Sequence, residues 1–191
     1  MIALDKKIIL ASKSPRRREL FSLITADYEC VAADVDESMV AAADASALCL
    51  ELARQKCLAA ALQFPENVVV GCDTVVDTDA GIIGKPHNQD QAREMLGILS
   101  KNTHKVYTGV YVKTPDTEKS LVCTSSVEFF AVPPHEIEAY IKTDEPYDKA
   151  GGYGIQGWAA RFIKRIDGDY YNIMGLPVSR LYNLLCDISA I

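Results

Sequence analysis

The 191-residue sequence predicts an α/β protein built on a mixed sheet, and three observations lead to this class. Short β-branched segments alternate with helical segments through the first hundred residues, as in parallel sheets with crossover helices. Two long strand-like segments then follow each other with only PDTE between them, which requires an antiparallel pair. No repeat or long linker separates parts of the chain, so we expect one domain over residues 1–191.

The elements of the first half are expected in a clear order. Residues 8–10 form a short buried strand, and a helix begins at Pro15 with Ser14 as its N-cap. DYECVAADVDES is a strand that runs into an acidic loop, and residues 44–62 form a helix rich in Ala and Leu. The β-branched segment ENVVVGCDTVVDT is a strand that ends in the turn DTDAG.

The second half continues with a mixture of both element types. IIGKP is a short strand that stops at Pro86, and residues 89–99 form a helix capped by Asn88. THKVYTGVYVKT and EKSLVCTSSVEFFAV are the two long strands. PPHEIEAYIKT begins a helix, RFIKRI and DYYNIM form a pair separated by DGD, and the last helix covers about residues 177–187.

Composition narrows the functional classes. The net charge is −6 and the pI about 5.1, whereas surfaces that bind nucleic-acid polymers are usually basic. No apolar run approaches the roughly 20 residues that cross a bilayer, so we expect no membrane partner. MIALDKKIIL holds an acid and too short an apolar segment for a secretory signal, which predicts a cytoplasmic location. The six cysteines form no CxxC pair or Cys/His cluster, which argues against zinc.

Three arginines, Arg16 to Arg18, follow the cap residue of the first helix. Cations at this end of a helix cost about 0.3–1 kcal/mol each, so their presence needs a reason. A solvated basic face is the ordinary interpretation of such a run. The alternative is phosphate binding, because Ser12, Ser14 and first-turn amides can surround an anion that guanidinium groups then bind. On an acidic chain, an isolated cationic focus favours a small anionic ligand.

Asp73 lies inside the apolar segment VVVGCDTVV, where an ionised carboxylate is costly unless it is paired or binds a metal. One interpretation is a structural aspartate held by backbone amides. The other is a ligand of Mg²⁺ or Mn²⁺, shared with Glu37 from the acidic loop that also holds Asp34 and Asp36. In triphosphate chemistry Mg²⁺ takes one or two carboxylates and fills its other positions with water and phosphate oxygens.

Two further features are less specific. Lys85 follows a strand end, where ligand sites of α/β proteins collect, although Lys85 and Lys56 are of a type more often found on the surface. The glycines of AGGYGIQG permit either close approach of the backbone to a ligand or simply a tight loop. This segment matches neither the Walker pattern nor the dinucleotide fingerprint. His87, His104 and His135 are scattered and suggest no catalytic triad.

Seven motifs in order resemble the Maf family of nucleoside triphosphate pyrophosphatases: LASKSPRR, DVDES, LARQKC, GCDTVV, GKP, DKAGGYGIQG and NIMGLPV. The resemblance spans nearly the whole chain. It implies the inosine-triphosphate-pyrophosphatase-like (Maf/Ham) fold, which is a mixed twisted sheet with flanking helices and a cleft between two lobes. It also implies a homodimer and a divalent metal cofactor, Mg²⁺ or Mn²⁺.

The resemblance also implies roles for individual residues. The family's serine–arginine turn holds phosphate, which here assigns Ser12, Ser14, Arg16 and Arg17. Asp73 corresponds to the proton acceptor, and the remaining acidic, lysine and glutamine motifs fall on Glu37, Lys56, Lys85 and Gln156. An ordinary aspartate pKa of about 3.9 makes a poor base at neutral pH, so metal ligation by Asp73 is physically easier. Lys13 departs from the family, where small residues are common.

The family branches by nucleotide base. Its thymidine/uridine branch carries Arg, Thr and Gln at three specificity positions, which match Arg17, Thr74 and Gln156. The amide of Gln156 can donate and accept, as the imide edge of thymine or uracil requires. The resemblance therefore implies an enzyme that converts dTTP and UTP, with modified pyrimidine nucleotides as further candidates, to the monophosphate and pyrophosphate. The alternative is a nucleotide-sensing inhibitor of septum formation that acts through a protein partner.

Overall fold

The computed structural model describes residues 7–191 except residues 34 and 38–39, so Asp34 and most of MIALDKK lie outside the described residues. The chain divides into two compact units. Unit 1 comprises Met1–Asp73, Thr108–Cys123 and Gly175–Ile191. Unit 2 comprises Thr74–Tyr107 and Thr124–Met174.

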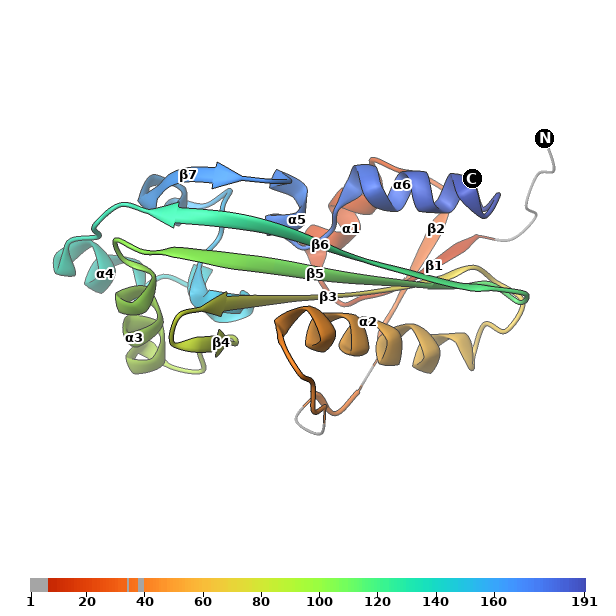
Figure 1. Cartoon of the computed structure of the whole chain (residues 1–191), viewed down its shortest axis with the longest axis horizontal. Coiled ribbons are helices and arrows are strands. Elements are labelled where there is room, and N and C mark those ends of the chain that lie inside the picture. Colours follow the sequence, from red (N-terminus) through yellow and green to blue (C-terminus); the bar gives the residue numbers. More distant parts are fainter. Residues whose placement is uncertain (1–6, 34, 38–39) are drawn as a thin grey trace. The chain divides into compact units, whose positions relative to one another are not determined.

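The described strands form one seven-stranded sheet with the order β2-β1-β3-β5-β6-β7, and β4 pairs with β3 (Figure 1). Their bounds are β1 Ile8–Ala11, β2 Tyr28–Val31, β3 Val69–Thr78, β4 Gly81–Ile83, β5 Thr103–Lys113, β6 Glu118–Phe129 and β7 Ile163–Asp167. β1 is parallel to both of its neighbours, with Leu10 opposite Cys30 and Val70. β4 and β7 are antiparallel to their partners, which confirms the predicted mixed sheet.

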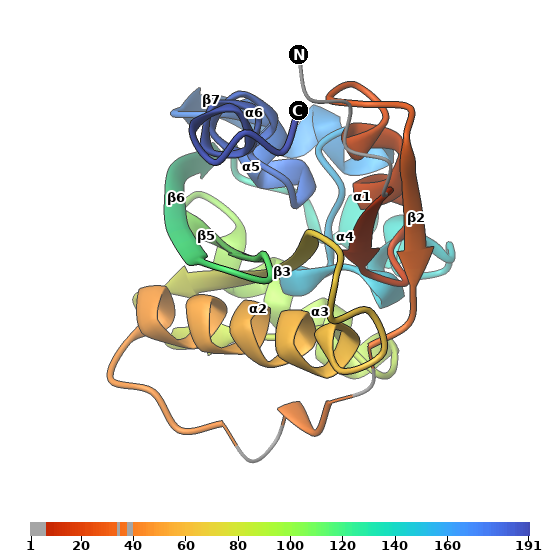
Figure 2. The same ribbon diagram turned by 90° about the vertical axis from the view of Figure 1, so that its right-hand side faces the viewer.

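Three helices belong to unit 1: α1 (Pro15–Phe21), α2 (Ala45–Ala61) and α6 (Val178–Asp187). α2 lies on one side of β1 and β3, and α6 lies on the other side (Figures 1 and 2). Gly71 in β3 and Gly109 in β5 let α2 approach the sheet closely, because a Cβ at either would lie within 2.7 Å of an α2 atom. These two glycines are therefore required by packing.

Unit 2 contains α3 (Gln89–Leu99), α4 (Pro134–Tyr140) and α5 (Tyr170–Met174), with short 3₁₀ turns η2 (Glu145–Asp148), η3 (Ala150–Gly152) and η4 (Trp158–Phe162). Its core is rich in aromatic side chains that meet edge to face. The Phe129 and Tyr153 rings lie 4.9 Å apart, and the Tyr140 and Phe162 rings lie 5.6 Å apart. Each such pair contributes about 0.5–1.5 kcal/mol to stability beyond what the burial of its apolar area contributes.

Most predicted elements are confirmed, including the caps Ser14 and Asn88. DYYNIM differs, because it forms the helix α5 and does not pair with RFIKRI, whose strand β7 pairs with β6 instead. The Asp169 carboxylate accepts the Tyr171 amide at 2.8 Å and so caps this helix. The buried Asn172 amide then donates to Val106 O at 3.0 Å. Capping and burial here outweigh the β-propensity of Tyr and Ile.

Among the described residues, no helix combines the length and the apolar character that crossing a bilayer requires.

Candidate active site

The serine–arginine turn follows the end of β1 and is held by its own hydroxyl groups. Ser12 is nearly buried, and its Oγ accepts the Ser14 amide at 3.2 Å. The Oγ of Ser14 accepts the Arg17 amide at 3.5 Å and caps α1. Pro15, at the first helical position, has no amide proton. The first turn therefore offers an anion fewer backbone donors than expected, and the side chains must supply most of the binding.

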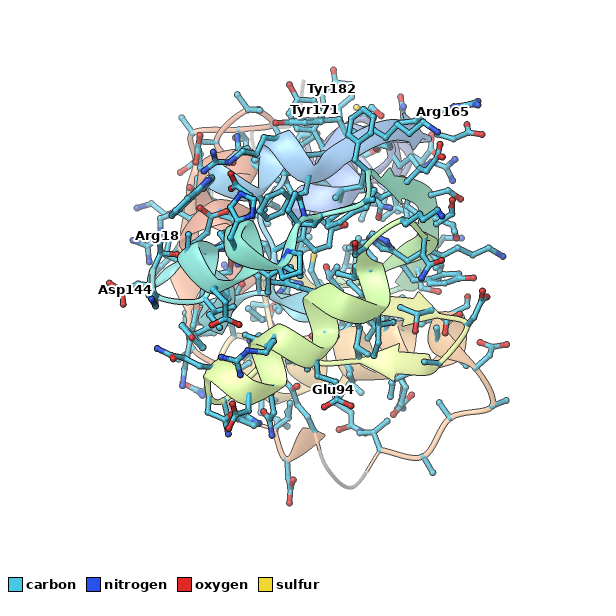
Figure 3. The ribbon with its side chains drawn as sticks, turned by 90° about the vertical axis from the view of Figure 1, so that its left-hand side faces the viewer. Arg18, Glu94, Asp144, Arg165, Tyr171 and Tyr182 are labelled. Carbon is cyan, nitrogen blue, oxygen red and sulfur yellow. The ribbon has the colours of Figure 1, made fainter. Side chains whose placement is uncertain are left out.

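The three arginines do not form one solvated face. Arg18 is exposed and points outward (Figure 3), and its backbone carbonyl accepts the Tyr28 hydroxyl at 2.8 Å. Arg16 and Arg17 are half-buried. The Nε of Arg17 donates to Gly175 O at 2.8 Å, across 158 positions of the chain. This contact fixes the plane of the Arg17 guanidinium, as a phosphate-binding group requires for a preorganised fork.

Asp73, Lys56 and Glu37 form a charged cluster in unit 1. The Lys56 ammonium lies 2.5 Å from Asp73 Oδ1 and 2.7 Å from Glu37 Oε1. The side chains of Lys56 and Asp73 are only 13% and 11% exposed, whereas that of Glu37 is 55% exposed. Lys56 is thus not a surface lysine, and Asp73 is balanced by an ion pair rather than by backbone amides alone. Pairing is what makes such a nearly buried carboxylate tolerable.

Two buried thiols lie near this cluster. Burial raises the pKa of Cys72 to about 12; Asp73 raises it further, and Arg17 and Lys56 oppose the rise. Burial, with a smaller contribution from Asp73, also raises the pKa of Cys49 to about 12. Burial therefore favours the protonated form of both thiols, which makes them poor nucleophiles. The chemistry of this region falls to its carboxylates and cations.

The carboxylates of the cluster are compatible with a divalent metal that arrives with a nucleotide. Asp73 and Glu37 each place an oxygen within 2.7 Å of the same Lys56 nitrogen, so both can reach one cation. Throughout the described part of the chain, no three His, Cys, Asp or Glu residues gather to hold a metal. Two carboxylates suit Mg²⁺ when phosphate oxygens and water complete its shell. The donor set fits a metal bound jointly with substrate.

In unit 2, the loop that carries Lys85 lies against the glycine-rich loop. Lys85 is exposed between Gly84, whose carbonyl accepts the Gly151 amide at 2.9 Å, and the buried Pro86. A Cβ on Gly152 would lie 3.3 Å from the Pro86 ring. Gly151 and Gly152 have φ values of 73° and 68°, which side chains rarely adopt. These two glycines thus serve a tight loop packed on its neighbour.

The rest of the glycine-rich loop surrounds two side chains that sequence reasoning missed. A Cβ on Gly154 would lie 2.9 Å from Lys149 Cε, and one on Gly157 would overlap the Glu145 carboxylate. Gln156, between these glycines, is exposed. Thr74 directly follows Asp73 in β3 and is half-buried. Nothing in DEPYDK marks Glu145 as different from an ordinary surface acid, so no sequence signal pointed to it.

The chain thus has a mixed-sheet α/β fold, with the serine–arginine turn directly after β1 and the Asp73–Lys56 ion pair between β3 and α2. The chain matches the model of the Maf-like protein family over residues 7–188, and it belongs to that family. This confirms the resemblance seen in the seven sequence motifs.

Relatives and a solved structure agree with this assignment. The dTTP/UTP pyrophosphatases of two Bacillus cereus strains are 43% and 46% identical to this chain over 176 residues. The matches cover 92% of this chain and 92% and 87% of those proteins. A HAM1 protein from Coxiella burnetii superposes with a TM-score of 0.56 at 14% identity, covering 95% of this chain and 99% of that one. This likeness confirms the Maf/Ham fold class.

Proposed function

We propose that this chain is a nucleoside triphosphate pyrophosphatase that hydrolyses dTTP and UTP between the α and β phosphates. The products are the nucleoside monophosphate and pyrophosphate. The relatives named dTTP/UTP pyrophosphatase, which match 92% of the chain, support this substrate class. The structural observation that carries the proposal is the nearly buried Asp73 of strand β3, whose carboxylate is paired with the Lys56 ammonium. It is the type of charged, oriented group that phosphoryl chemistry uses.

The triphosphate is assigned to the cations and hydroxyls predicted from the sequence. Arg16 and Arg17 bind phosphate oxygens through their guanidinium groups, and the hydroxyls of Ser12 and Ser14 donate to the same oxygens. Lys85 supplies a further positive charge as a catalytic residue. The contact between Arg17 and Gly175 O supports this role, because a guanidinium already held in one plane loses less entropy on binding.

Asp73 and Glu37 would hold the divalent metal, Mg²⁺ or Mn²⁺. When bound, the metal supplies positive charge to the phosphates and lowers the pKa of coordinated water. The chain's own residues prepare this position, since Lys56 keeps the two carboxylates close together and balances their charge. Asp73 also orients the attacking water by accepting a hydrogen bond from it. Catalysis by positioning and charge is typical of phosphoryl transfer.

Thr74 and Gln156 are assigned to the pyrimidine base. The Gln156 amide offers one donor group and one acceptor, which complement the carbonyl and N3–H of thymine or uracil. A site built to hydrogen-bond a substrate group rejects analogues that lack it much more strongly than an apolar pocket does. Since a single methyl group is worth only about 1–3 kcal/mol, we expect both dTTP and UTP, and modified pyrimidine nucleotides, to be accepted.

The test is pyrophosphate release from a panel of nucleoside triphosphates, with Mg²⁺, with Mn²⁺ and with a chelator. We expect release from dTTP and UTP with either metal and none with the chelator. Binding of UTP without release would contradict the proposal and favour the nucleotide sensor. No observation favours the septum-formation inhibitor, and we do not propose it.

We also propose a homodimer, which the family resemblance implies, in the cytoplasm, which the sequence MIALDKKIIL predicts. All six cysteines are free thiols, which agrees with a reducing compartment. Light scattering of the purified chain at micromolar concentration tests the dimer, with about twice the 20.9 kDa chain mass expected.

A further inference from the structure

Glu145, at the start of η2, holds together three segments of unit 2. Its Oε2 accepts the Trp158 amide at 2.8 Å, and its Oε1 accepts the Ala159 amide at 3.4 Å. Oε1 also accepts the Tyr140 hydroxyl at 3.1 Å. One carboxylate thus links the end of α4, the turn η2 and the first residues of η4.

These contacts make Glu145 the N-terminal cap of η4. The cap position itself is Gly157, which has no side chain and makes no side-chain cap hydrogen bond. The first amides of a helical turn lack partners within the turn and favour a negative charge nearby. Glu145 supplies both the acceptors and the charge from 13 residues away. The point at which η4 begins therefore depends on this side chain.

The loop before η4 is shaped to admit this carboxylate. Gly157 leaves space that a Cβ would take from the Glu145 carboxylate, and Gly154 leaves space for Lys149. The Lys149 ammonium in turn donates to Glu145 O at 2.7 Å. Neither Gly154 nor Gly157 is among the glycines with positive φ, so it is space rather than backbone conformation that requires them. Gln156 lies between these two glycines, two residues before Trp158, the first residue of η4.

We propose that Glu145 is a positioning residue for Gln156, and that through Gln156 it sets the discrimination between nucleotide bases. The inference rests on the proposed function, in which Gln156 contacts the base. By fixing the start of η4 at Trp158, Glu145 restricts the backbone of Gly157 and of Gln156 directly before it. A hydrogen-bonding amide displaced by about 1 Å loses much of its effect, whereas groups that act on the phosphates stay in place. Loss of Glu145 should therefore reduce base selectivity more than turnover.

The test compares four variants in steady-state pyrophosphate release from UTP and CTP with Mg²⁺. They are Glu145→Gln, Gln156→Ala, the double variant, and Glu138→Gln as a control. Glu138 also lies in unit 2, and its carboxylate oxygens accept from Arg93 at 2.5 and 3.1 Å. Glu145→Gln keeps the shape of the side chain but replaces one acceptor oxygen with an NH₂ donor. This donor would face the backbone N–H of Trp158 or Ala159, which is itself a donor, so one of the cap hydrogen bonds is lost.

We expect Glu145→Gln to lower the ratio of kcat/KM for UTP to that for CTP by about tenfold or more, mainly through KM for UTP. The double variant should discriminate no less than Gln156→Ala alone, because Glu145 acts through Gln156. The control should keep the wild-type ratio. A merely structural role would lower kcat/KM for both nucleotides equally and leave the ratio unchanged, and this result would overturn the inference.

Two further outcomes keep this inference separate from the proposed function. A wild-type protein that releases no pyrophosphate from UTP contradicts the function and the inference together. A wild type that discriminates through Gln156, with an unchanged ratio in Glu145→Gln, contradicts the inference alone. If Glu145→Gln does not fold, amide exchange of the wild type decides: we expect the Trp158 amide to exchange more slowly than that of Gln156, and the reverse order would overturn the cap.

Discussion

The charged cluster of unit 1 and the glycine-rich loop of unit 2 are built in opposite ways. Lys56 and Asp73 lie inside regular elements, the helix α2 and the strand β3, whose backbone hydrogen bonds fix them. Gln156 lies between the short 3₁₀ turns η3 and η4. The Glu145 carboxylate holds the start of η4, and Gly157 leaves the space for that carboxylate. Rigid elements thus carry the groups assigned to phosphate chemistry, and a tethered loop carries the group assigned to the base. Substitutions in the two regions should separate turnover from selectivity.

Asp73→Asn should have the largest effect, and it should fall on turnover. The variant keeps the shape of the side chain but removes the charge, so kcat is expected to drop by about 10²-fold or more for UTP and CTP alike. Removing an unpaired buried charge would raise the free energy of unfolding. Because the structure pairs Asp73 with Lys56, we instead expect a loss of about 1–2 kcal/mol in the free energy of unfolding. Kinetics and denaturant unfolding on one preparation measure both.

A near-normal kcat in Asp73→Asn would contradict the catalytic assignment. A damaged fold, with activity falling only in proportion to the folded fraction, would show that Asp73 is structural.

Arg17→Ala should lower kcat/KM for UTP by about tenfold or more, because a charge-assisted contact is worth about 1.5–3 kcal/mol. Arg18→Ala is the matched control, since Arg18 is the next arginine of the same helix and is exposed. It should leave kcat/KM nearly unchanged. The loss of the contact with Gly175 O should also cost Arg17→Ala about 1 kcal/mol of stability in the absence of ligand. Equal kinetics for the two variants would argue for a solvated basic face.

Gln156→Glu should change the selectivity between bases, because its effect depends on which base is bound. It removes the amide donor and adds a charge near the base, so hydrolysis of dTTP and UTP should fall and the ratio between bases should shift by about tenfold. Gln63→Glu, at an exposed position after α2, controls for the added charge. An equal loss for every nucleotide would mean that Gln156 holds the loop or the phosphates and does not read the base.

The smallest expected effect is on the free energy of unfolding as the pH falls. It concerns the core of unit 2, next to the glycine-rich loop's Tyr153. Burial lowers the pKa of His104 in the unit 2 core to about 4, and its Nε2 lies 2.6 Å from the Tyr153 hydroxyl. As the pH falls, His104 is therefore protonated in the unfolded chain before it is protonated in the folded chain. Its contribution to the free energy of unfolding is complete above about pH 6.5 and is lost as the pH falls towards 4. The expected loss at pH 5.5 is about 1 kcal/mol. Denaturant unfolding of wild type and His104→Gln measures it, and a parallel pH profile in both would contradict the assignment.

Features that depend on local sequence were predictable. Ser14 and Asn88 cap helices because a short polar side chain reaches an amide three positions later, a contact that needs no distant partner. The long helix, the two long strands and the Maf/Ham class follow in the same way from periodicity and ordered motifs. Asp73 was identified because a carboxylate in an apolar strand is costly wherever the strand packs.

Features that depend on distant partners were not predictable. The burial of Lys56 follows from its position on the face of α2 that meets β3, and Arg17 is held by a carbonyl 158 residues away. Glu145 has no local signature, since its role arises from amides 13 and 14 residues later. DYYNIM carries residues that favour strands, and the distant partners of Asn172, together with the Asp169 cap, make it a helix. Tertiary contacts decided each of these cases.

The most direct test of the central claim is product analysis from UTP and dTTP with Mg²⁺, using wild type and Asp73→Asn from parallel preparations. The account predicts one pyrophosphate and one nucleoside monophosphate for each triphosphate consumed by the wild type, and at least about 100-fold slower formation of both by Asp73→Asn. Release of inorganic phosphate with a nucleoside diphosphate, or equal rates in the two proteins, would contradict it.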